Sequence, residues 1–111
     1  MPHIKLCKLS ELELIDSRGF VISDVEPERN IFIVRKDNDI YGYENSCPHN
    51  FMPMEWQPDT FLNYDKDYIQ CANHGALFEI SNGTCIYGPC IGQALDNIDI
   101  KVEDNIVYAV L

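Results

Sequence analysis

Two short segments of the chain each combine a thiol with an imidazole. In Cys47-Pro48-His49 one residue separates the two side chains, and in Cys71-Ala72-Asn73-His74 two residues separate them. Together the pairs offer two sulfur and two nitrogen ligands, a set that suits iron–sulfur clusters and zinc alike. Zinc fingers more often place like ligands together, as C-x₂₋₄-C and H-x₃₋₅-H. The mixed pairs therefore favour an iron–sulfur cluster, with a structural Cys₂His₂ zinc domain as the alternative.

The two motifs resemble the Rieske family, and specifically its small ferredoxin-like members. The family pattern is C-x-H followed by C-x-x-H-G-x-x-[FL], and the second half is matched by residues 71–78, with Gly88-Pro89 as a further match downstream. The resemblance runs from about residue 31 to residue 111, and residues 4–24 match only in general strand pattern. It implies one Rieske-type [2Fe–2S] cluster, with Cys47 and Cys71 on one iron and His49 and His74 on the other. It also implies cluster-binding loops at about 45–58 and 71–75 and a covering loop at about 87–92.

The chain departs from the family at positions that matter for the loops and for the reduction potential. Phe51 stands where family members usually carry glycine, and Met52 and Asn73 replace the loop-bridging cysteines of respiratory Rieske proteins. That disulfide cannot form, so the chain does not resemble a respiratory subunit. High-potential members resemble His-Gly-Ser-x-Tyr, whose hydroxyls donate hydrogen bonds to sulfur, whereas this chain has Ala76 and Phe78. We therefore expect a potential at the low end of the Rieske range, roughly −150 to +300 mV.

Short strands separated by turn residues must position these motifs. The pattern predicts hairpins that join 31–34 to 40–43, 76–80 to 84–87 through Asn82-Gly83, and 98–103 to 106–110. Alternation of Ile98, Ile100 and Val102 with charged residues predicts one buried strand face. Earlier strands are expected at 4–9 and 20–23, and a helical turn at 10–13. The sequence predicts a single all-β domain over residues 1–111, an antiparallel sandwich or small barrel.

The remaining chemistry-bearing side chains have ordinary structural explanations. We expect Cys7, Cys85 and Cys90 to pack as small apolar residues, and we expect no Cys85–Cys90 disulfide in a reducing compartment. His3 is expected to be solvated near a mobile terminus. The apolar loop residues either pack within the loop or form an exposed apolar surface for a partner, and we favour packing for Phe51, Met52, Met54 and Trp56. The loop aspartates are either simply solvated or steer a basic partner, and we favour solvation for Asp59, Asp65 and Asp67.

Composition limits the classes of partner. Eight Lys and Arg residues stand against 18 Asp and Glu, for a formal net charge of −10, which disfavours nucleic acid. The charge suits either a basic patch on a protein partner or simply solubility. No apolar segment approaches the roughly 20 residues that span a bilayer, and no signal peptide is visible. We therefore expect a cytoplasmic protein that does not bind membranes.

The sequence lacks the parts that substrate chemistry would need. Apart from the proposed ligands only His3 remains, too few histidines for a 2-His-1-carboxylate iron site, and no Gly-rich dinucleotide fingerprint is present. The resemblance implies a non-enzymatic one-electron carrier, or ferredoxin, between a flavin-containing reductase and an acceptor oxidoreductase. Two alternatives stay open. One is a small subunit of an oxygenase or nitrite-reductase-like complex, and the other is a redox- or iron-sensing binding module.

Overall fold

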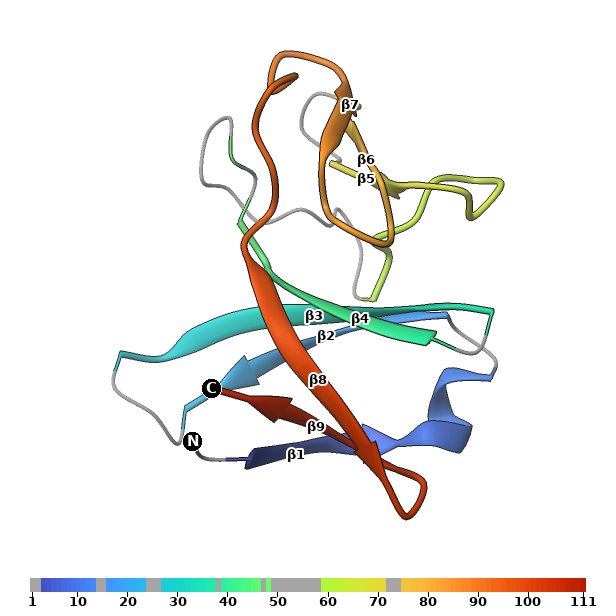
Figure 1. Cartoon of the computed structure of the whole chain (residues 1–111), viewed down its shortest axis with the longest axis vertical. Coiled ribbons are helices and arrows are strands. Elements are labelled where there is room, and N and C mark those ends of the chain that lie inside the picture. The colour runs from blue at the N-terminus through green and yellow to red at the C-terminus, as the bar shows by residue number, and fades with distance from the viewer. Residues whose placement is uncertain are drawn as a thin grey trace.

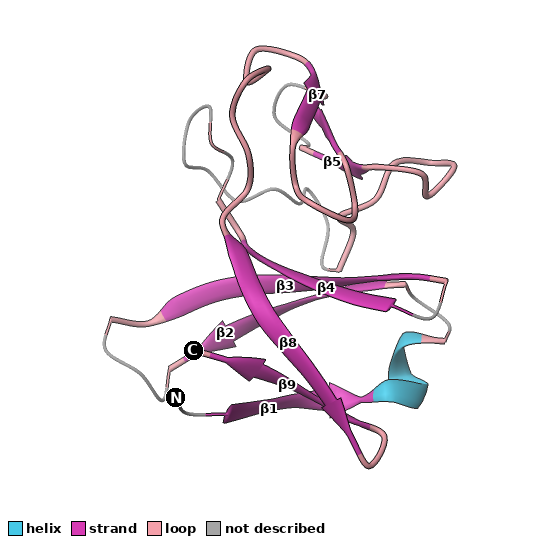
Figure 2. Cartoon of the chain, in the orientation of Figure 1, coloured by secondary structure: helices cyan, strands magenta, loops and turns pink. Residues whose placement is uncertain are grey.

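The computed structural model describes residues 3–13, 16–23, 27–37, 39–46, 48, 59–71 and 75–111. Within these residues the chain forms two antiparallel sheets and one short 3₁₀ helix (Figures 1 and 2). The elements are β1 (His3–Lys8), η1 (Leu9–Leu12), β2 (Ser17–Ile22), β3 (Arg29–Lys36), β4 (Asp39–Glu44), β5 (Ile69–Gln70), β6 (Leu77–Phe78), β7 (Cys85–Tyr87), β8 (Asn97–Glu103) and β9 (Ile106–Val110).

The larger sheet has the strand order β1-β9-β8-β4-β3-β2 and curls into a partly open barrel (Figure 1). Two of its hairpins are those predicted, since β3 pairs with β4 as far as Lys36 and Asp39, and β8 pairs with β9 as far as Glu103 and Ile106. Asp104 and Asn105 connect β8 to β9 with φ of 52° and 63°. Such left-handed pairs match the twist of a two-residue hairpin. The all-β prediction is confirmed.

The smaller sheet has the order β5-β6-β7 and lies beyond the β3–β4 side of the barrel (Figure 1). The hairpin predicted at Asn82-Gly83 is present, but its strands are shorter than the pattern suggested. Asn82 Oδ1 accepts a hydrogen bond from the Thr84 amide at 2.9 Å, and Gly83 has φ of 72°. Thr84 forms a bridge with Ala94 instead of extending the hairpin, so β7 begins only at Cys85.

Strand β3 explains how the two sheets share a core. Phe32 and Val34 belong to the core cluster that includes the small sheet, whereas Ile31 and Ile33 belong to the two clusters inside the barrel. All four side chains are fully buried. Because successive side chains point to opposite faces of a strand, a continuous apolar run here means that both faces of β3 are covered.

Two sequence predictions need correction in the barrel. Ile98 is buried, but Val102 is 45% exposed, because the β8–β9 hairpin extends past the sheet that would cover it. The alternation therefore predicts burial correctly at Ile98 and in part at Ile100, which packs against both barrel clusters, but not at Val102. His3 is exposed as expected, yet it is part of β1, paired with Val110 and with its ring 6.4 Å from that of Tyr108.

Candidate metal centre

Cys71 is the one predicted ligand that the described residues include. It directly follows β5 and is fully buried. Its amide donates a hydrogen bond to the Ala76 carbonyl at 2.9 Å, and its carbonyl accepts one from the Gly75 amide at 2.9 Å. Gly75 has φ of 65°, a conformation that glycine adopts without strain. The predicted loop 71–75 is therefore closed at its base by two backbone hydrogen bonds.

Cys47, His49 and His74 lie outside the described residues, so the four-ligand set stays a prediction. Also outside the described residues are Phe51, Met52, Met54, Trp56 and Asn73. Among the described residues no three His, Cys, Asp or Glu side chains gather as a metal site.

The wall beside Cys71 is apolar. Ala76 and Phe78 are both fully buried, and β5 pairs with β6 so that Ile69 faces Phe78. Neither an alanine nor a phenylalanine side chain can donate a hydrogen bond. The described part of the site thus fits an iron–sulfur cluster, because it offers a buried thiol beside apolar side chains.

The turn after β7 packs directly on this wall. Gly88 has φ of 102°, and a Cβ atom at this position would lie 3.0 Å from both Cα and Cβ of Ala76. Only glycine permits so close an approach, so Gly88 brings the turn 88–92 against the residue that hydrogen-bonds Cys71. The turn thus packs beside the predicted site, and the covering role of residues 87–92 stays a prediction.

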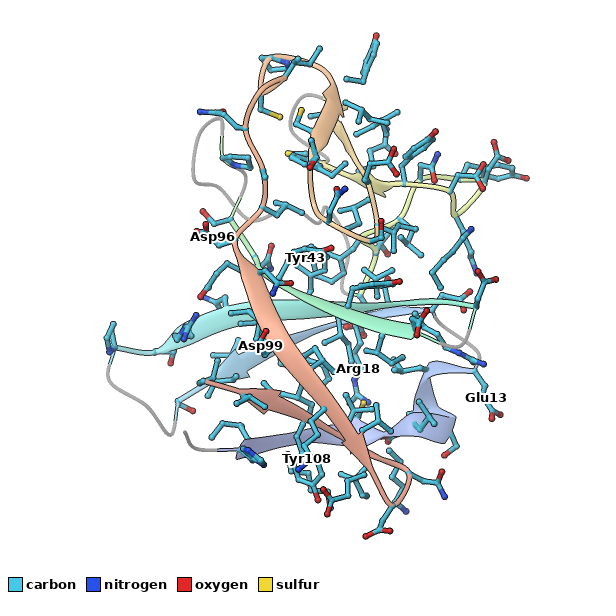
Figure 3. The ribbon with its side chains drawn as sticks, viewed as in Figure 1. Glu13, Arg18, Tyr43, Asp96, Asp99 and Tyr108 are labelled. Carbon is cyan, nitrogen blue, oxygen red and sulfur yellow. The ribbon has the colours of Figure 1, made fainter. Side chains whose placement is uncertain are left out.

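The described residues at the start of the first predicted loop lie beside the segment that follows the turn 88–92. Ser46 and Pro48 line a surface pocket of about 320 Å³ together with Gln93, Ala94 and Asp96, the segment that follows the covering turn. The Glu44 amide donates to the Asp96 carbonyl at 2.9 Å, which joins the end of β4 to the start of β8. Figure 3 shows Asp96 at this junction between the barrel and the smaller sheet.

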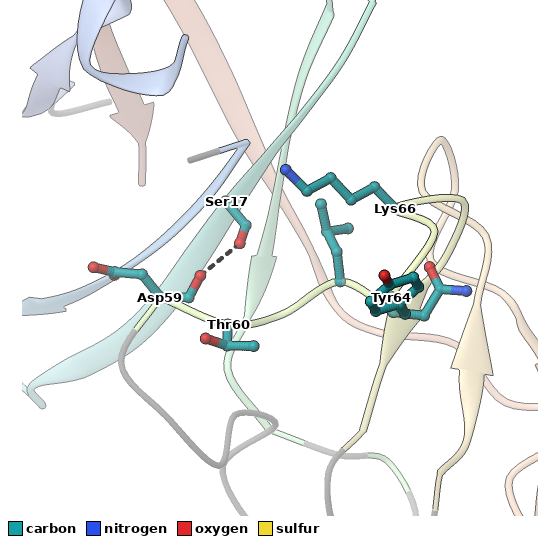
Figure 4. A pocket seen from close by; sticks show the side chains of 7 residues that line it. Ser17, Asp59, Thr60, Tyr64 and Lys66 are labelled. Atoms are coloured by element: carbon teal, nitrogen blue, oxygen red, sulfur yellow. Dashed lines mark hydrogen bonds between the residues drawn. The ribbon is translucent and has the colours of Figure 1, made fainter. Parts of the chain in front are cut away.

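Asp59 has a structural role that the sequence did not indicate. Its carbonyl accepts a hydrogen bond from Ser17 Oγ at 2.7 Å, and its Oδ1 accepts one from the Gly19 amide at 2.9 Å. Figure 4 shows Ser17 and Asp59 beside a pocket of about 270 Å³. Asp59 therefore fastens the segment that enters the smaller sheet to β2. The expectation that it is simply solvated is wrong, and its spacing from Ser17 carries no sequence signal.

Tyr43 links the barrel to the smaller sheet from the other side. Its hydroxyl donates to the Ile80 carbonyl at 2.5 Å, and its side chain is fully buried. Burial, with a smaller contribution from Tyr41, raises the pKa of Tyr43 from 10.0 to about 12. Phe32 adds to this junction by stacking on Phe61 with ring centroids 4.3 Å apart. Such aromatic pairs contribute about 0.5–1.5 kcal/mol beyond their buried area.

The cysteines outside the ligand set are buried, as predicted. Cys7 packs inside the barrel, where burial raises the pKa of its thiol. Cys85 and Cys90 pack in the core cluster that also contains Cys71. The Cys85 and Cys90 Sγ atoms lie only 2.6 Å apart, a contact that the sequence pattern did not predict. The sequence signal for this contact is that the two cysteines are five positions apart and flank a Gly-Pro turn.

Comparison with protein families shows the family to which the chain belongs. The model of the Rieske [2Fe-2S] domain matches residues 3–103, and the chain therefore belongs to the Rieske [2Fe–2S] family. The family is defined by one Rieske cluster, which is accordingly the cofactor of this chain. No curated protein matches the sequence.

Solved structures share the fold at low sequence identity. The ferredoxin of carbazole 1,9a-dioxygenase from Nocardioides aromaticivorans IC177 is 18% identical with a TM-score of 0.77, and the match covers 99% of this chain and 98% of that one. A ferredoxin from Sphingomonas yanoikuyae B1 is 20% identical with a TM-score of 0.73, covering 99% of each. A complex of reduced oxygenase and oxidized ferredoxin in carbazole 1,9a-dioxygenase contains a chain that is 21% identical with a TM-score of 0.77, covering 97% and 92%.

In the part of the chain that the structure describes, no helix has the length and apolarity that crossing a membrane would require.

Proposed function

We propose that this chain is a one-electron carrier, a Rieske-type ferredoxin of the cytoplasm, and not itself an enzyme. The observation that carries the proposal is the family match over residues 3–103. A structural likeness that extends over nearly the whole length of two ferredoxins supports it. Residues 1–111 would act as a single domain in this role.

We assign the cluster to Cys47 and Cys71 on one iron and His49 and His74 on the other. When bound, the cluster supplies a one-electron couple whose irons are saturated by protein ligands. Cys71 would present its thiolate from the base of the loop that its hydrogen bonds with Gly75 and Ala76 close. Ala76 and Phe78 exclude water from this side and donate no hydrogen bond, which favours a low potential.

A carrier needs a donor and an acceptor that supply the chemistry it lacks. We propose a flavin-containing reductase as donor and an oxygenase, or another acceptor oxidoreductase, as acceptor. The similar solved complex of oxygenase and ferredoxin in carbazole 1,9a-dioxygenase supports a protein acceptor of this kind. The net charge of −10 supports docking on a basic surface and argues against nucleic acid.

Metal analysis and EPR test the proposal on the purified chain. We expect iron and acid-labile sulfide in equal amounts, about two of each per chain, and after dithionite a signal with the lowered average g value of mixed nitrogen and sulfur ligation. Cys71→Ser should lose iron and signal together. Cys7→Ser is the matched control, since Cys7 is also buried but belongs to a different core cluster. A zinc-loaded chain without sulfide would overturn the carrier and support the zinc alternative.

A further inference from the structure

Cys85 and Cys90 bring two thiols into direct contact at the covering turn. Their Sγ atoms are 2.6 Å apart, and the side chains are only 3% and 1% exposed. A disulfide bond is about 2.05 Å long, so closing one here requires a movement of roughly half an ångström.

The backbone holds both cysteines in this arrangement. The Cys85 amide donates to the Gln93 carbonyl at 3.0 Å, and the Gln93 amide donates to the Cys90 carbonyl at 2.9 Å. The contact of Gly88 with Ala76 fixes the middle of the turn against the core. Because the backbones of both cysteines hydrogen-bond to the same residue, Gln93, the two backbone positions are held close together.

Exposed side chains flank both buried cysteines in the sequence. Cys85 Sγ donates to the Tyr87 carbonyl at 3.4 Å, which orients the thiol when it is reduced. The neighbouring side chains are largely exposed, Tyr87 at 62% and Ile91 at 66%. These contacts hold the turn in the resting structure, and a transient local opening at its exposed side chains would admit a small reagent.

We propose that Cys85 and Cys90 form a redox-active dithiol site whose reaction partner is a low-molecular-weight disulfide such as glutathione disulfide. One thiol loses its proton and attacks the disulfide, forming a mixed disulfide and releasing one thiol molecule. The second cysteine then attacks the mixed disulfide, forming the Cys85–Cys90 bond and releasing the second thiol molecule. The two cysteines are oxidised by two electrons, and one disulfide molecule is reduced to two thiols.

The bond would lock the covering turn in place. It closes a ring of six residues, 85–90, and the chain-entropy relation for such a loop gives roughly a 40-fold smaller unfolding equilibrium constant. The turn packs on Ala76, whose carbonyl accepts a hydrogen bond from the Cys71 amide. The disulfide would therefore restrict the motion of the turn beside the cluster. This last consequence rests on the proposed function, whereas the dithiol chemistry does not.

The experiment equilibrates the purified chain in glutathione buffers of increasing oxidised fraction and traps free thiols by alkylation. Trypsin leaves Cys71, Cys85 and Cys90 in one peptide, 67–101, and fragment ions locate the crosslink. We expect a Cys85–Cys90 bond that forms and disappears reversibly with the buffer ratio in the wild type and in Cys7→Ser. Cys90→Ala should instead hold a mixed disulfide at Cys85. Absence of the bond at every ratio, or pairing of either cysteine with Cys71, would overturn the proposal.

A second measurement separates this proposal from the carrier function. The unfolding midpoint of the wild type should rise on oxidation, and the double variant Cys85→Ala/Cys90→Ala should show no such shift. If the double variant does not fold, the presence or absence of the Cys85–Cys90 crosslink in the wild type still tests the dithiol proposal. A chain that crosslinks but shows no iron–sulfur EPR signal would refute only the carrier, and a chain with the signal but without the crosslink would refute only the dithiol site.

Discussion

At the scale of single residues, we infer that Ala76 influences the reduction potential of the cluster. It is fully buried beside Cys71. The resemblance of residues 71–78 to the family motif implies that high-potential members carry a hydroxyl at this position. A hydroxyl that donates to sulfur stabilises the added electron of the reduced state. We expect Ala76→Ser to raise the midpoint potential by roughly several tens of millivolts, measured by redox titration monitored by visible absorbance.

The matched control for this substitution is Ala109→Ser. Ala109 is also fully buried, but it lies in a core cluster inside the barrel. Both variants bury a hydroxyl and should lower stability, yet only Ala76→Ser should change the potential. Equal shifts in the two variants, or a wild-type midpoint that is clearly positive, would contradict the argument from missing hydroxyls.

At the scale of elements, the smaller sheet is held to the barrel by a few long-range contacts. Asp59 fastens it to β2, and Tyr43 fastens the β6–β7 hairpin to β4. A Cβ atom at Gly83 would lie 2.8 Å from the Tyr43 ring, so the turn has no room for a larger residue. These contacts hold the smaller sheet against the barrel, and removing them should lower the free energy of unfolding.

Tyr43 makes the stability depend on pH in the alkaline range. Its pKa is raised to about 12 in the folded state from an ordinary 10.0. Below pH 10 the phenol is protonated whether folded or unfolded, and the stabilisation is fully present. As the pH rises from about 10 to about 12 the unfolded chain loses this proton first, so the stabilisation is progressively lost.

We therefore expect Tyr43→Phe to lower the unfolding free energy at pH 7 by about 1–3 kcal/mol, because the Ile80 carbonyl loses its buried donor. The gap between variant and wild type should narrow between pH 10 and 12. Denaturant unfolding at several pH values measures both effects. Tyr64→Phe is the control, since Tyr64 is 99% exposed, and it should match the wild type throughout. A constant gap would refute the titration argument.

At the scale of the whole molecule, a net charge of −10 makes association with a basic partner dependent on salt. The Debye length falls from about 10 Å at 0.1 M to about 3 Å at 1 M, so the second-order rate of electron transfer should fall over this range. Asp96→Lys, at the end that carries the predicted loops, should slow the reaction and weaken its salt dependence.

Glu103→Lys provides the control for position. It changes the net charge equally but lies at the far end of β8, away from the predicted loops. Stopped-flow mixing of the reduced chain with an acceptor oxygenase compares the two variants. Equal effects would mean that net charge alone matters, and a rate independent of salt would contradict electrostatic docking.

The sequence by itself determined the features that depend on local pattern. Alternation and turn chemistry located the hairpins of β3–β4 and β8–β9, and the ligand motifs with Gly75 indicated the family. Cys47, His49 and His74 remain predictions. Each of these signals lies within a few neighbouring residues, because residue type directly limits the backbone conformation of a turn or strand.

Only the tertiary structure decided the contacts between distant segments. Asp59 with Ser17 and Tyr43 with Ile80 join residues that are 42 and 37 positions apart, and no periodicity links such pairs. Even the close approach of Cys85 to Cys90 depends on Gln93 and on the packing of Gly88, not on spacing alone. Local pattern specifies the strands, whereas steric fit and buried hydrogen bonds between strands decide what meets at their ends.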